Sequence, residues 1–287
     1  MKILSRILCL ILLSTPGLAE NLTLKDGKVI AAKSLRRQGD SIMATVELPA
    51  TEVGKPPKTA EIGHPVNQIE KIEFPDPPIL KTAPNMIAEG NAAKALAEIE
   101  PVLKYFESFL EIPGSWWTDV ALLKVQALVA LKRDAEAEPL ARQVSKLTKD
   151  AETVRAVNAQ IAACLLRRGQ FAQALELSDS VLKAATGNAT LATASVTKGL
   201  CLLDRKDWEG ALLAFLAVPV FHPEQKILMG PSMLGSGRSY FGMEDFKRAK
   251  ETLNELITSL PNSPEAEQAK NELTLIARRE KALADPK

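Results

Sequence analysis

The chain has very little of the chemistry on which most active sites depend. Its 287 residues include 2 histidines and 3 cysteines, and aromatic residues make up 5%. His64 and His222 lie in different regions, so a Ser–His or Cys–His relay has no supported pairing. The cysteines form no CxxC motif and no Cys/His cluster, which argues against a zinc site. We therefore predict no catalytic residue, no metal site and no cofactor.

The chain also carries almost no net charge. Lys and Arg (36) balance Asp and Glu (35), with both signs interspersed. Such a chain has no net-charge signal for binding nucleic acid or anionic lipid. Gly230, Gly235 and Gly237 resemble a phosphate loop only superficially, because Arg238-Ser239 follows where Gly-Lys-Ser/Thr is needed. The expected partner is therefore a protein or peptide and not a nucleic acid.

No hydrophobic run is long enough to span a bilayer, which needs ~20 apolar residues. The longest at the start, residues 7–13, follows Lys2 and Arg6 and precedes Gly17-Leu18-Ala19. A positive start, a short apolar core and small residues before a cut define a secretory signal peptide. We predict cleavage of residues 1–19 between Ala19 and Glu20. The mature protein would be periplasmic or secreted, with no transmembrane segment.

Residues 20–75 have the pattern of a small β module. Apolar residues alternate with other residues from Ile42 to Leu48, a period of two that buries one face of a strand. Asp26-Gly27 and Gln38-Gly39-Asp40 have the composition of tight turns between strands. Four or five strands in ~55 residues favour a small, curled antiparallel sheet or barrel.

A proline-rich stretch marks the end of this module. Residues 76–82 begin with Asp76-Pro77-Pro78, and prolines favour a stiff, extended linker. From residue 83 to residue 287 the composition shifts to Ala, Leu, Glu, Lys and Arg, which are strong helix formers. This second part is predicted to be helical throughout.

The helical part repeats. Ala174, Ala211 and Ala249 lie 37 and 38 residues apart, and each follows an aromatic residue by three positions. A period in the thirties is typical of stacked helical hairpins. The segment Gly237-x-x-Tyr240, Phe246-x-x-Ala249, Leu253, Leu256 and Pro261 resembles the tetratricopeptide repeat. The resemblance covers roughly residues 79–261, and it implies a mainly α fold: a right-handed α-solenoid of hairpins behind the small β module.

The repeat weakens toward the N-terminus. Aligned on Leu131 and Leu166, the hairpin near residues 116–148 has Glu136 and Pro139 where Phe171 and Ala174 fall. Pro84 and Pro101 predict kinks or shortened ends in the first hairpin. At the other end, residues 265–284 are expected to form the capping helix that such arrays need. The segment around Pro261-Asn262-Ser263-Pro264 is similar to repeats of bacterial cell-envelope proteins.

The resemblance also implies a binding surface, because one side of each first helix lines the concave groove of such arrays. Mapped onto this chain, the groove would have an apolar floor and cationic edges suited to a peptide segment, one with a carboxylate included. Its residues would be Lys124, Leu128, Leu131, Arg167, Leu200, Leu203, Leu234, Arg238 and Phe241. An equally good interpretation is that the last helix or the β module fills this groove.

Two other features have plainer interpretations. Cys164 and Cys201 fall at equivalent repeat positions, where neighbouring helix axes are ~8–10 Å apart. They are expected to be small buried residues rather than a disulfide. Trp116 and Trp117 are adjacent and cannot share a helix face, so one is expected to pack on the first hairpin while the other partly covers the junction beside it. An exposed ring that binds a partner is the less favoured alternative.

These observations favour a non-catalytic, exported interaction scaffold in the cell envelope. Two alternatives remain. One is an envelope hydrolase with its site between the β module and the solenoid, although the sequence has no suitable cluster of His, Asp or Glu. The other is a structural subunit of an envelope assembly in which the β module binds the partner.

Overall fold

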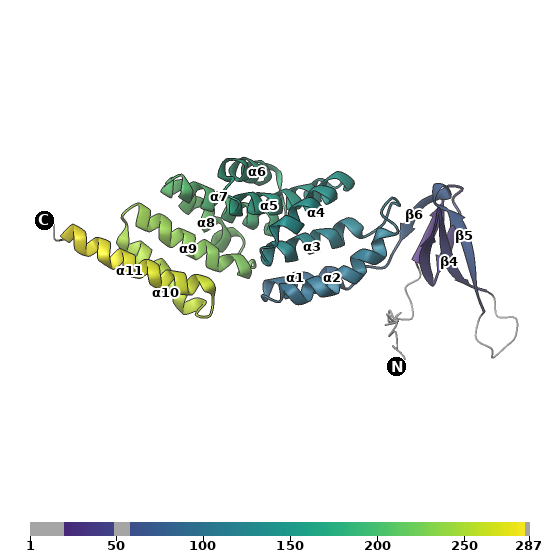
Figure 1. Ribbon diagram of the computed structural model, residues 1–287, viewed down its shortest axis with the longest axis horizontal. Coiled ribbons are helices and arrows are strands. Elements are labelled where there is room, and N and C mark those ends of the chain that lie inside the picture. Colours follow the sequence, from purple (N-terminus) through teal and green to yellow (C-terminus); the bar gives the residue numbers. More distant parts are fainter. Residues whose placement is uncertain (1–19, 49–57, 285–287) are drawn as a thin grey trace, which may run out of the picture. The chain divides into compact units, whose positions relative to one another are not determined.

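The computed structural model describes residues 20–48 and 58–284 and divides the chain into two compact units (Figure 1). The first unit holds the β strands together with the segment Tyr105–Trp116, and the second holds Pro78–Lys104 and the chain from Trp117 onward. The expected signal peptide, residues 1–19, lies outside the described residues. The expected linker is shorter than 76–82, because the first helix begins at Ile79.

The described part of the β unit contains six strands in two three-stranded antiparallel sheets. One sheet has the order β2-β1-β6 and the other β3-β4-β5. The small antiparallel β module predicted as a curled sheet or barrel is confirmed, and it has at least one strand more than the four or five expected. The strands are β1 (Glu20–Leu24), β2 (Val29–Ala32), β3 (Ser34–Gln38), β4 (Ser41–Glu47), β5 (Thr59–Pro65) and β6 (Ile69–Glu73).

The two predicted tight turns form β hairpins. Gly27 and Gly39 both have positive φ, which a glycine adopts without steric cost. The first joins β1 to β2, and the second joins β3 to β4 with Gln38 paired to Ser41. In β4 the alternation places Ile42 and Ala44, both 0% exposed, on the buried face.

A segment far along the chain completes the β unit. Tyr105–Trp116 begins in the last turn of α2 (Ala92–Glu107) and continues into the connection before the next helix. Rings from this segment pack around Phe74, with centroids 5.1 Å away for Phe106 and 5.0 Å for Phe109. The backbone N–H of Ile72 donates to the Pro113 carbonyl at 2.9 Å. The aromatic core of the β unit therefore comes from two stretches about 30 residues apart.

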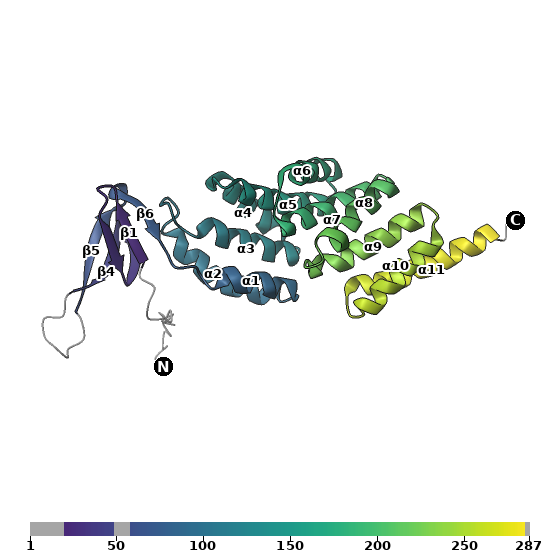
Figure 2. The ribbon, with the colours of Figure 1, turned by 180° about the vertical axis from the view of Figure 1, so that it is seen from behind.

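The second unit is a row of helices joined by short turns (Figures 1 and 2). Its helices are α1 (Ile79–Ala88), α2 up to Lys104, α3 (Trp117–Ala130), α4 (Asp134–Leu147), α5 (Ala151–Arg167), α6 (Phe171–Ala184), α7 (Asn188–Asp204), α8 (Trp208–Phe221), α9 (Lys226–Gly242), α10 (Phe246–Ser259) and α11 (Pro264–Ala284). Pro84 and Pro101 lie inside α1 and α2, and both helices continue past them.

Each hairpin turn contains one residue in the left-handed backbone region. These residues lie two positions before the second helix of their hairpins: Gly90, Lys132, Gly169, Lys206 and Glu244. Glycine adopts this conformation freely, whereas a residue with a side chain is strained there by about 1–2 kcal/mol. The turn thus fixes an unambiguous structural register for the repeat, even where the sequence offers Lys or Glu in place of Gly.

This register corrects the alignment of the α3–α4 hairpin. Counting from Lys132, the small residue of the repeat is Ala137 and not Pro139, and the helix starts with Asp134 where the three C-terminal hairpins have an aromatic residue. Ala137 is 0% exposed, like Ala174, Ala211 and Ala249. The expected departure from the pattern at Pro139 was wrong, since the alignment was displaced by two residues.

The first helices of successive hairpins form a continuous row. Contacts join α1 to α3, α3 to α5, α5 to α7, α7 to α9 and α9 to α11. Each second helix from α4 to α10 packs against the first helices on both sides of it. The corresponding sides of the first helices therefore form one continuous surface along the array, as in stacked repeats.

Small residues on the first helices make room for large side chains from the second helices. A Cβ on Gly199 or Gly235 would lie 2.7 or 2.3 Å from the ring of Phe215, which is 0% exposed. A Cβ on Gly237 would lie 2.6 Å from Leu253. Gly235 and Gly237 therefore serve close helix packing, which accounts for glycine at these positions without a phosphate-binding loop.

Candidate interaction surface on the first helices

The structural register identifies an apolar row along the first helices. It consists of the residue three positions before each positive-φ residue, on α3, α5, α7 and α9. All four side chains are half-buried and apolar: Val129, Leu166, Leu203 and Phe241. We call these four residues the first-helix row. Equivalent positions on neighbouring helices place their side chains on one shared side of the array.

The next turn of each helix adds a second line beside this row. The residues six positions before the turn residue are Gln126, Ala163, Leu200 and Arg238. Ala163 is buried at 8% exposure, and the other three are half-buried. Of the nine sequence-predicted groove residues, Leu203 and Phe241 belong to the first-helix row, and Leu200 and Arg238 belong to the second line. A fifth, Leu234, lies one helical turn before Arg238 on the same helix. Leu234 lies in the core at 4% exposure.

The other predicted residues are placed differently. The two-residue displacement in the α3–α4 hairpin had selected Lys124, Leu128 and Leu131, whereas the structural equivalents are Leu122, Gln126 and Val129. Leu128 is a packing residue, 1% exposed. Val129 and Leu166 are not among the predicted residues. Leu166 could have been found by counting back three residues from Gly169, whereas Val129 depends on the turn at Lys132, which the residue type does not indicate.

The predicted cationic edges are already paired with carboxylates. Lys124 lies 3.4 Å from Glu100, Arg167 binds Asp134, and Arg238 binds Glu272 at 2.7 Å. Arg238 also donates to the side-chain oxygen of Gln268 at 3.3 Å. The surface is therefore electrostatically mixed, and a ligand carboxylate would have to compete with these pairs.

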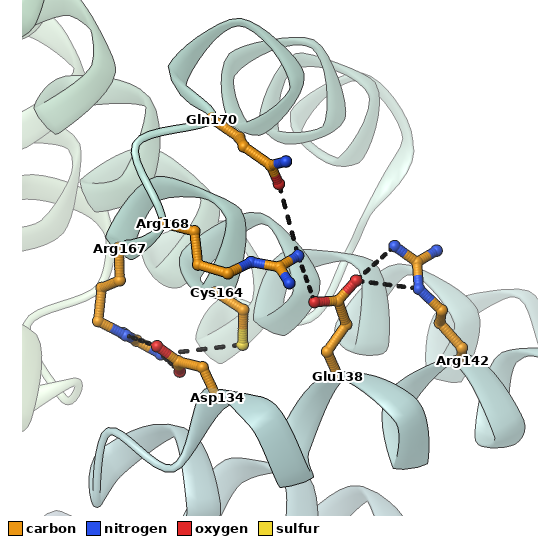
Figure 3. Close-up of polar contacts among 7 residues, drawn as sticks. All are labelled: Asp134, Glu138, Arg142, Cys164, Arg167, Arg168 and Gln170. Atoms are coloured by element: carbon orange, nitrogen blue, oxygen red, sulfur yellow. Dashed lines mark hydrogen bonds and ion pairs between the residues drawn. The ribbon is translucent and has the colours of Figure 1, made fainter.

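The Arg167 pair belongs to a polar network between α4 and the α5–α6 turn, drawn in Figure 3. The Nε of Arg167 donates to Asp134 at 2.7 Å, and a second guanidinium nitrogen binds the other carboxylate oxygen. Nearby, Glu138 accepts from Arg142 and pairs with Arg168 at 2.5 Å. Asp134 occupies the position where α6, α8 and α10 begin with an aromatic ring, so an ion pair replaces aromatic packing at this junction.

This ion pair predicts a specific acid sensitivity. Arg167 lowers the pKa of Asp134 below its ordinary value of 3.8, mainly through their hydrogen bonds. A carboxyl whose folded pKa is depressed stabilises the fold above its unfolded pKa and loses that contribution as pH falls through the folded pKa. Asp134→Asn should therefore cost about 1–2 kcal/mol at neutral pH, and the cost should shrink at an acid pH that lies below the lowered pKa of the folded Asp134 carboxyl.

Urea unfolding of wild type and Asp134→Asn, followed by far-UV circular dichroism at both pH values, measures this difference. Glu176→Gln, on the exposed side of α6, is the control and should change stability little at either pH. An Asp134→Asn difference that stays constant from neutral to acid pH would show that the pair contributes nothing electrostatic.

A pocket of about 350 Å³ lies at the C-terminal end of the first-helix row. Trp208, Phe241 and Phe246 supply aromatic surface, and Arg238 and Arg279 supply guanidinium groups. Gly242 and Glu244 complete the lining. Gly242 is needed because a Cβ there would lie 2.4 Å from the Trp208 ring. The volume lies in the range of sites that take a small ligand or one large side chain.

The charges at this pocket also occur in pairs. Arg279 donates to Glu244 at 3.0 Å, and the two side chains are 53% and 58% exposed. Such an exposed pair contributes little stability and opens readily. The pocket therefore combines an apolar wall with a polar rim that can rearrange around a ligand.

The cysteines Cys164 and Cys201 and the tryptophans Trp116 and Trp117 lie in buried or half-buried positions. Cys164 and Cys201 are free and buried, as expected. Burial raises the pKa of the Cys164 thiol to about 12 and that of Cys201 to about 11. The packed placement expected for the tryptophans is confirmed: Trp117 is 3% exposed, and half-buried Trp116 donates its indole N–H to the Phe74 carbonyl within the β unit.

Within the described residues, no group of three or more His, Cys, Asp or Glu side chains is arranged to hold a metal ion. The same residues include no helix long and apolar enough to cross a membrane.

The hairpins, their common register and the row of first helices define the second unit as an α-solenoid. Residues 232–263, which hold most of α9 and all of α10, match the family model of the tetratricopeptide repeat. The helical unit is thus an α-solenoid of helical hairpins that contains a tetratricopeptide repeat at residues 232–263. Arrays of this kind are scaffolds for protein–protein interaction.

Among solved structures, the chain is similar to YrrB, described as a tetratricopeptide repeat protein with an unusual peptide-binding site. The two are 18% identical, with a TM-score of 0.41 over 68% of this chain and 91% of that chain. No curated protein sequence matches the chain. The fold assignment rests on the hairpins described above and on the matched repeat.

Proposed function

We propose that the chain is a non-catalytic scaffold that binds a segment of a partner protein along the first-helix row. One observation carries the proposal: Val129, Leu166, Leu203 and Phe241 occupy the same position on four successive helices and all remain half-buried. Adjacent helices are ~8–10 Å apart, which is the distance spanned by about three residues of an extended chain. A partner segment with apolar residues at that spacing would meet each helix in turn.

The pocket at the end of the row supplies an anchoring point. Its aromatic walls, Trp208, Phe241 and Phe246, surround a volume suited to one large apolar side chain. Such pockets concentrate binding energy, because a side chain inserted there is desolvated on most sides. The partner is therefore proposed to carry an aromatic or large aliphatic residue at one end of its apolar pattern.

The ion pairs on this surface make a carboxylate on the partner less important than the sequence suggested. Arg167 and Arg238 are engaged by Asp134 and Glu272, so the surface offers no uncompensated positive edge at these residues. We therefore infer that apolar contact supplies most of the affinity. Binding should depend only weakly on salt, since exposed charge attraction is the component that salt screens.

The scaffold is also proposed to act after export, in the cell envelope or outside the cell. Residues 1–19 support this through their basic start, apolar core and small residues before Glu20. N-terminal sequencing of the protein recovered from the producing cell tests it: a chain that begins at Glu20 in the exported fraction is expected. An intact Met1 start confined to the cytoplasm would contradict it.

A peptide-display selection on the purified protein tests the binding site and does not require the partner's identity. We expect wild type to enrich peptides with apolar residues about three positions apart. Leu200→Gln with Leu203→Gln should abolish enrichment, because two neighbouring apolar contacts become polar while helix propensity is kept.

The matched control is Leu147→Gln with Leu275→Gln, two leucines that are 43% and 47% exposed on α4 and α11. This variant should enrich the same peptides as wild type. The proposal fails if wild type enriches no peptide, or if the Leu200/Leu203 variant enriches the same set.

A further inference from the structure

A second surface lies on the outer side of α8, away from the first-helix row in the repeat. The three most exposed large hydrophobic side chains among the described residues all belong to this helix: Leu213 at 72%, Phe221 at 70% and Val220 at 62%. Ile227, at the start of α9, is 42% exposed. Single exposed apolar residues are ordinary, whereas a cluster on one helix marks an interaction surface.

Neighbouring second helices provide an internal comparison. α4, α6, α8 and α10 each have 14 residues and start two positions after the turn residue, so their positions correspond one to one. Where α8 has Leu213, the others have Pro139, Glu176 and Glu251, and where it has Val220 they have Lys146, Lys183 and Thr258. All of these positions are exposed. The solenoid itself therefore does not require apolar residues there.

The charge pattern narrows the kind of partner. Residues 210–223 contain no Lys, Arg, Asp or Glu, and exposed Glu209 and Glu224 stand at the two ends of this stretch. A helix that lies on a membrane surface needs Lys or Arg beside its apolar face, and acidic flanks disfavour anionic lipid. A strongly charged protein partner would find no complementary group on this face.

We propose that the outer face of α8 pairs with the same face of a second copy of the chain. An uncharged apolar helix is complementary to itself, and a two-fold interface brings the same patch together from both copies. With the two-fold axis at Ala217, midway between Leu213 and Phe221, the two helices run antiparallel. Leu213 of each copy then meets Phe221 of the other, and exposed Glu209 approaches the end that carries both exposed Glu224 and exposed Lys226.

Ala217 suits the crossing point of two helices. Its small, half-buried side chain lets the backbones approach at the close end of the ~8–10 Å range for packed helices. One helix face is small compared with the ~800 Å² per partner of a standard interface. The dimer is therefore expected to be modest in affinity, with a dissociation constant on the order of 10 μM.

Sedimentation velocity of the full protein between about 1 and 200 μM tests this pairing. Wild type should shift from monomer to dimer. Replacing the outer residues of α8 with those that α6 carries, Leu213→Glu, Val220→Lys and Phe221→Ala, should raise the dissociation constant at least ~30-fold. A control on α10, Glu251→Gln with Thr258→Lys, should leave it unchanged.

Thermal unfolding at low concentration should show that the triple variant keeps its fold, since α6 accommodates the same residues. If the triple variant fails to fold, Phe221→Ser, the residue of α10 at that position, replaces it. Wild type that stays monomeric throughout, or a dimer unaffected by these changes, would overturn the proposal.

Cysteine cross-linking tests the two-fold geometry directly. Ala217→Cys should form a disulfide-linked dimer under mild oxidation, because both copies place this residue at the axis. Cys164 and Cys201 are buried and should not compete. Glu255→Cys, at the equivalent position of α10, should stay monomeric; equal cross-linking of both variants, or of neither, would contradict the two-fold pairing.

Discussion

Replacing Gly114 with alanine is expected to destabilise the β unit by about 3–6 kcal/mol, enough to unfold it in part of the molecules. Gly114 has φ +92°, a conformation that L side chains rarely adopt. An added Cβ would also lie 1.8 Å from the carbonyl oxygen of Ile72 and 3.0 Å from its carbonyl carbon. These are backbone atoms of strand β6, so they cannot move aside as a flexible side chain would.

The clash falls where the distant segment joins the sheet. The Ile72 N–H donates to the carbonyl of Pro113, the residue just before Gly114. Movement that relieves the clash therefore breaks this hydrogen bond and separates Phe109 from Phe74, whose rings are 5.0 Å apart. Loss of the segment removes a large part of the unit's aromatic core.

Hydrogen exchange read by mass spectrometry measures this effect for each unit separately, which a single unfolding curve of a two-unit protein does not. Peptides from β1 to β6 should lose protection in Gly114→Ala, while peptides from α5 to α10 keep it. Gly169→Ala is the matched control: its φ is also positive, at +73°, but no atom lies within 4 Å of the added Cβ. It should cost only about 1–2 kcal/mol. Equal effects of the two changes would show that the Ile72 contact is unimportant.

Truncation of Phe215 is expected to produce the largest loss in the helical unit, about 3–5 kcal/mol for Phe215→Ala. The ring is fully buried and fits between Gly199 of α7 and Gly235 of α9. The ring occupies the space that a larger residue at either glycine would need, because a Cβ on Gly199 or Gly235 would lie within 2.7 Å of it. The cavity left by truncation therefore lies between two first helices of the row.

A double-mutant cycle makes the test specific. Gly235→Ala alone should destabilise by about 1–3 kcal/mol through overpacking against Phe215. In the Phe215→Ala background the same change should be neutral or stabilising, since alanine is a better helix former than glycine by ~1 kcal/mol. Denaturant unfolding followed by circular dichroism gives the four free energies. Additive effects would contradict direct packing of the ring on Gly235.

The sequence was sufficient for the fold class and for the three C-terminal hairpins. There an aromatic residue opens each second helix and an alanine follows three positions later, so Phe171, Trp208 and Phe246 locate the register. At the α3–α4 hairpin this opening aromatic residue is absent. Helix α4 begins with Asp134, which forms an ion pair with Arg167 instead. A positive φ at Lys132 cannot be read from the residue type, and the alignment was displaced accordingly.

The sequence could not predict which chain segments form the β unit, because this depends on contacts between stretches that are distant along the chain. Phe106 and Phe109 look like part of an amphipathic helical run, and only their packing on Phe74 assigns them to the β unit. The ion pairs of Arg167 and Arg238 were hidden in the same way. Their partners, Asp134 and Glu272, lie more than 30 residues away and on other helices.

The apolar surface of α8 could not be predicted for a different reason. Its residues are plain in the sequence, but an uninterrupted apolar stretch predicts burial as readily as exposure. Only the exposure of Leu213, Val220 and Phe221 in the folded chain distinguishes the two.

The central claim is that the first-helix row binds a partner segment. Its most direct test is titration calorimetry with one peptide enriched on wild type, added to wild type, to Leu200→Gln/Leu203→Gln and to Leu147→Gln/Leu275→Gln. The account predicts saturable binding to wild type and to the Leu147/Leu275 control, and at least ~30-fold weaker binding to the Leu200/Leu203 variant. Equal affinity for all three proteins would contradict it.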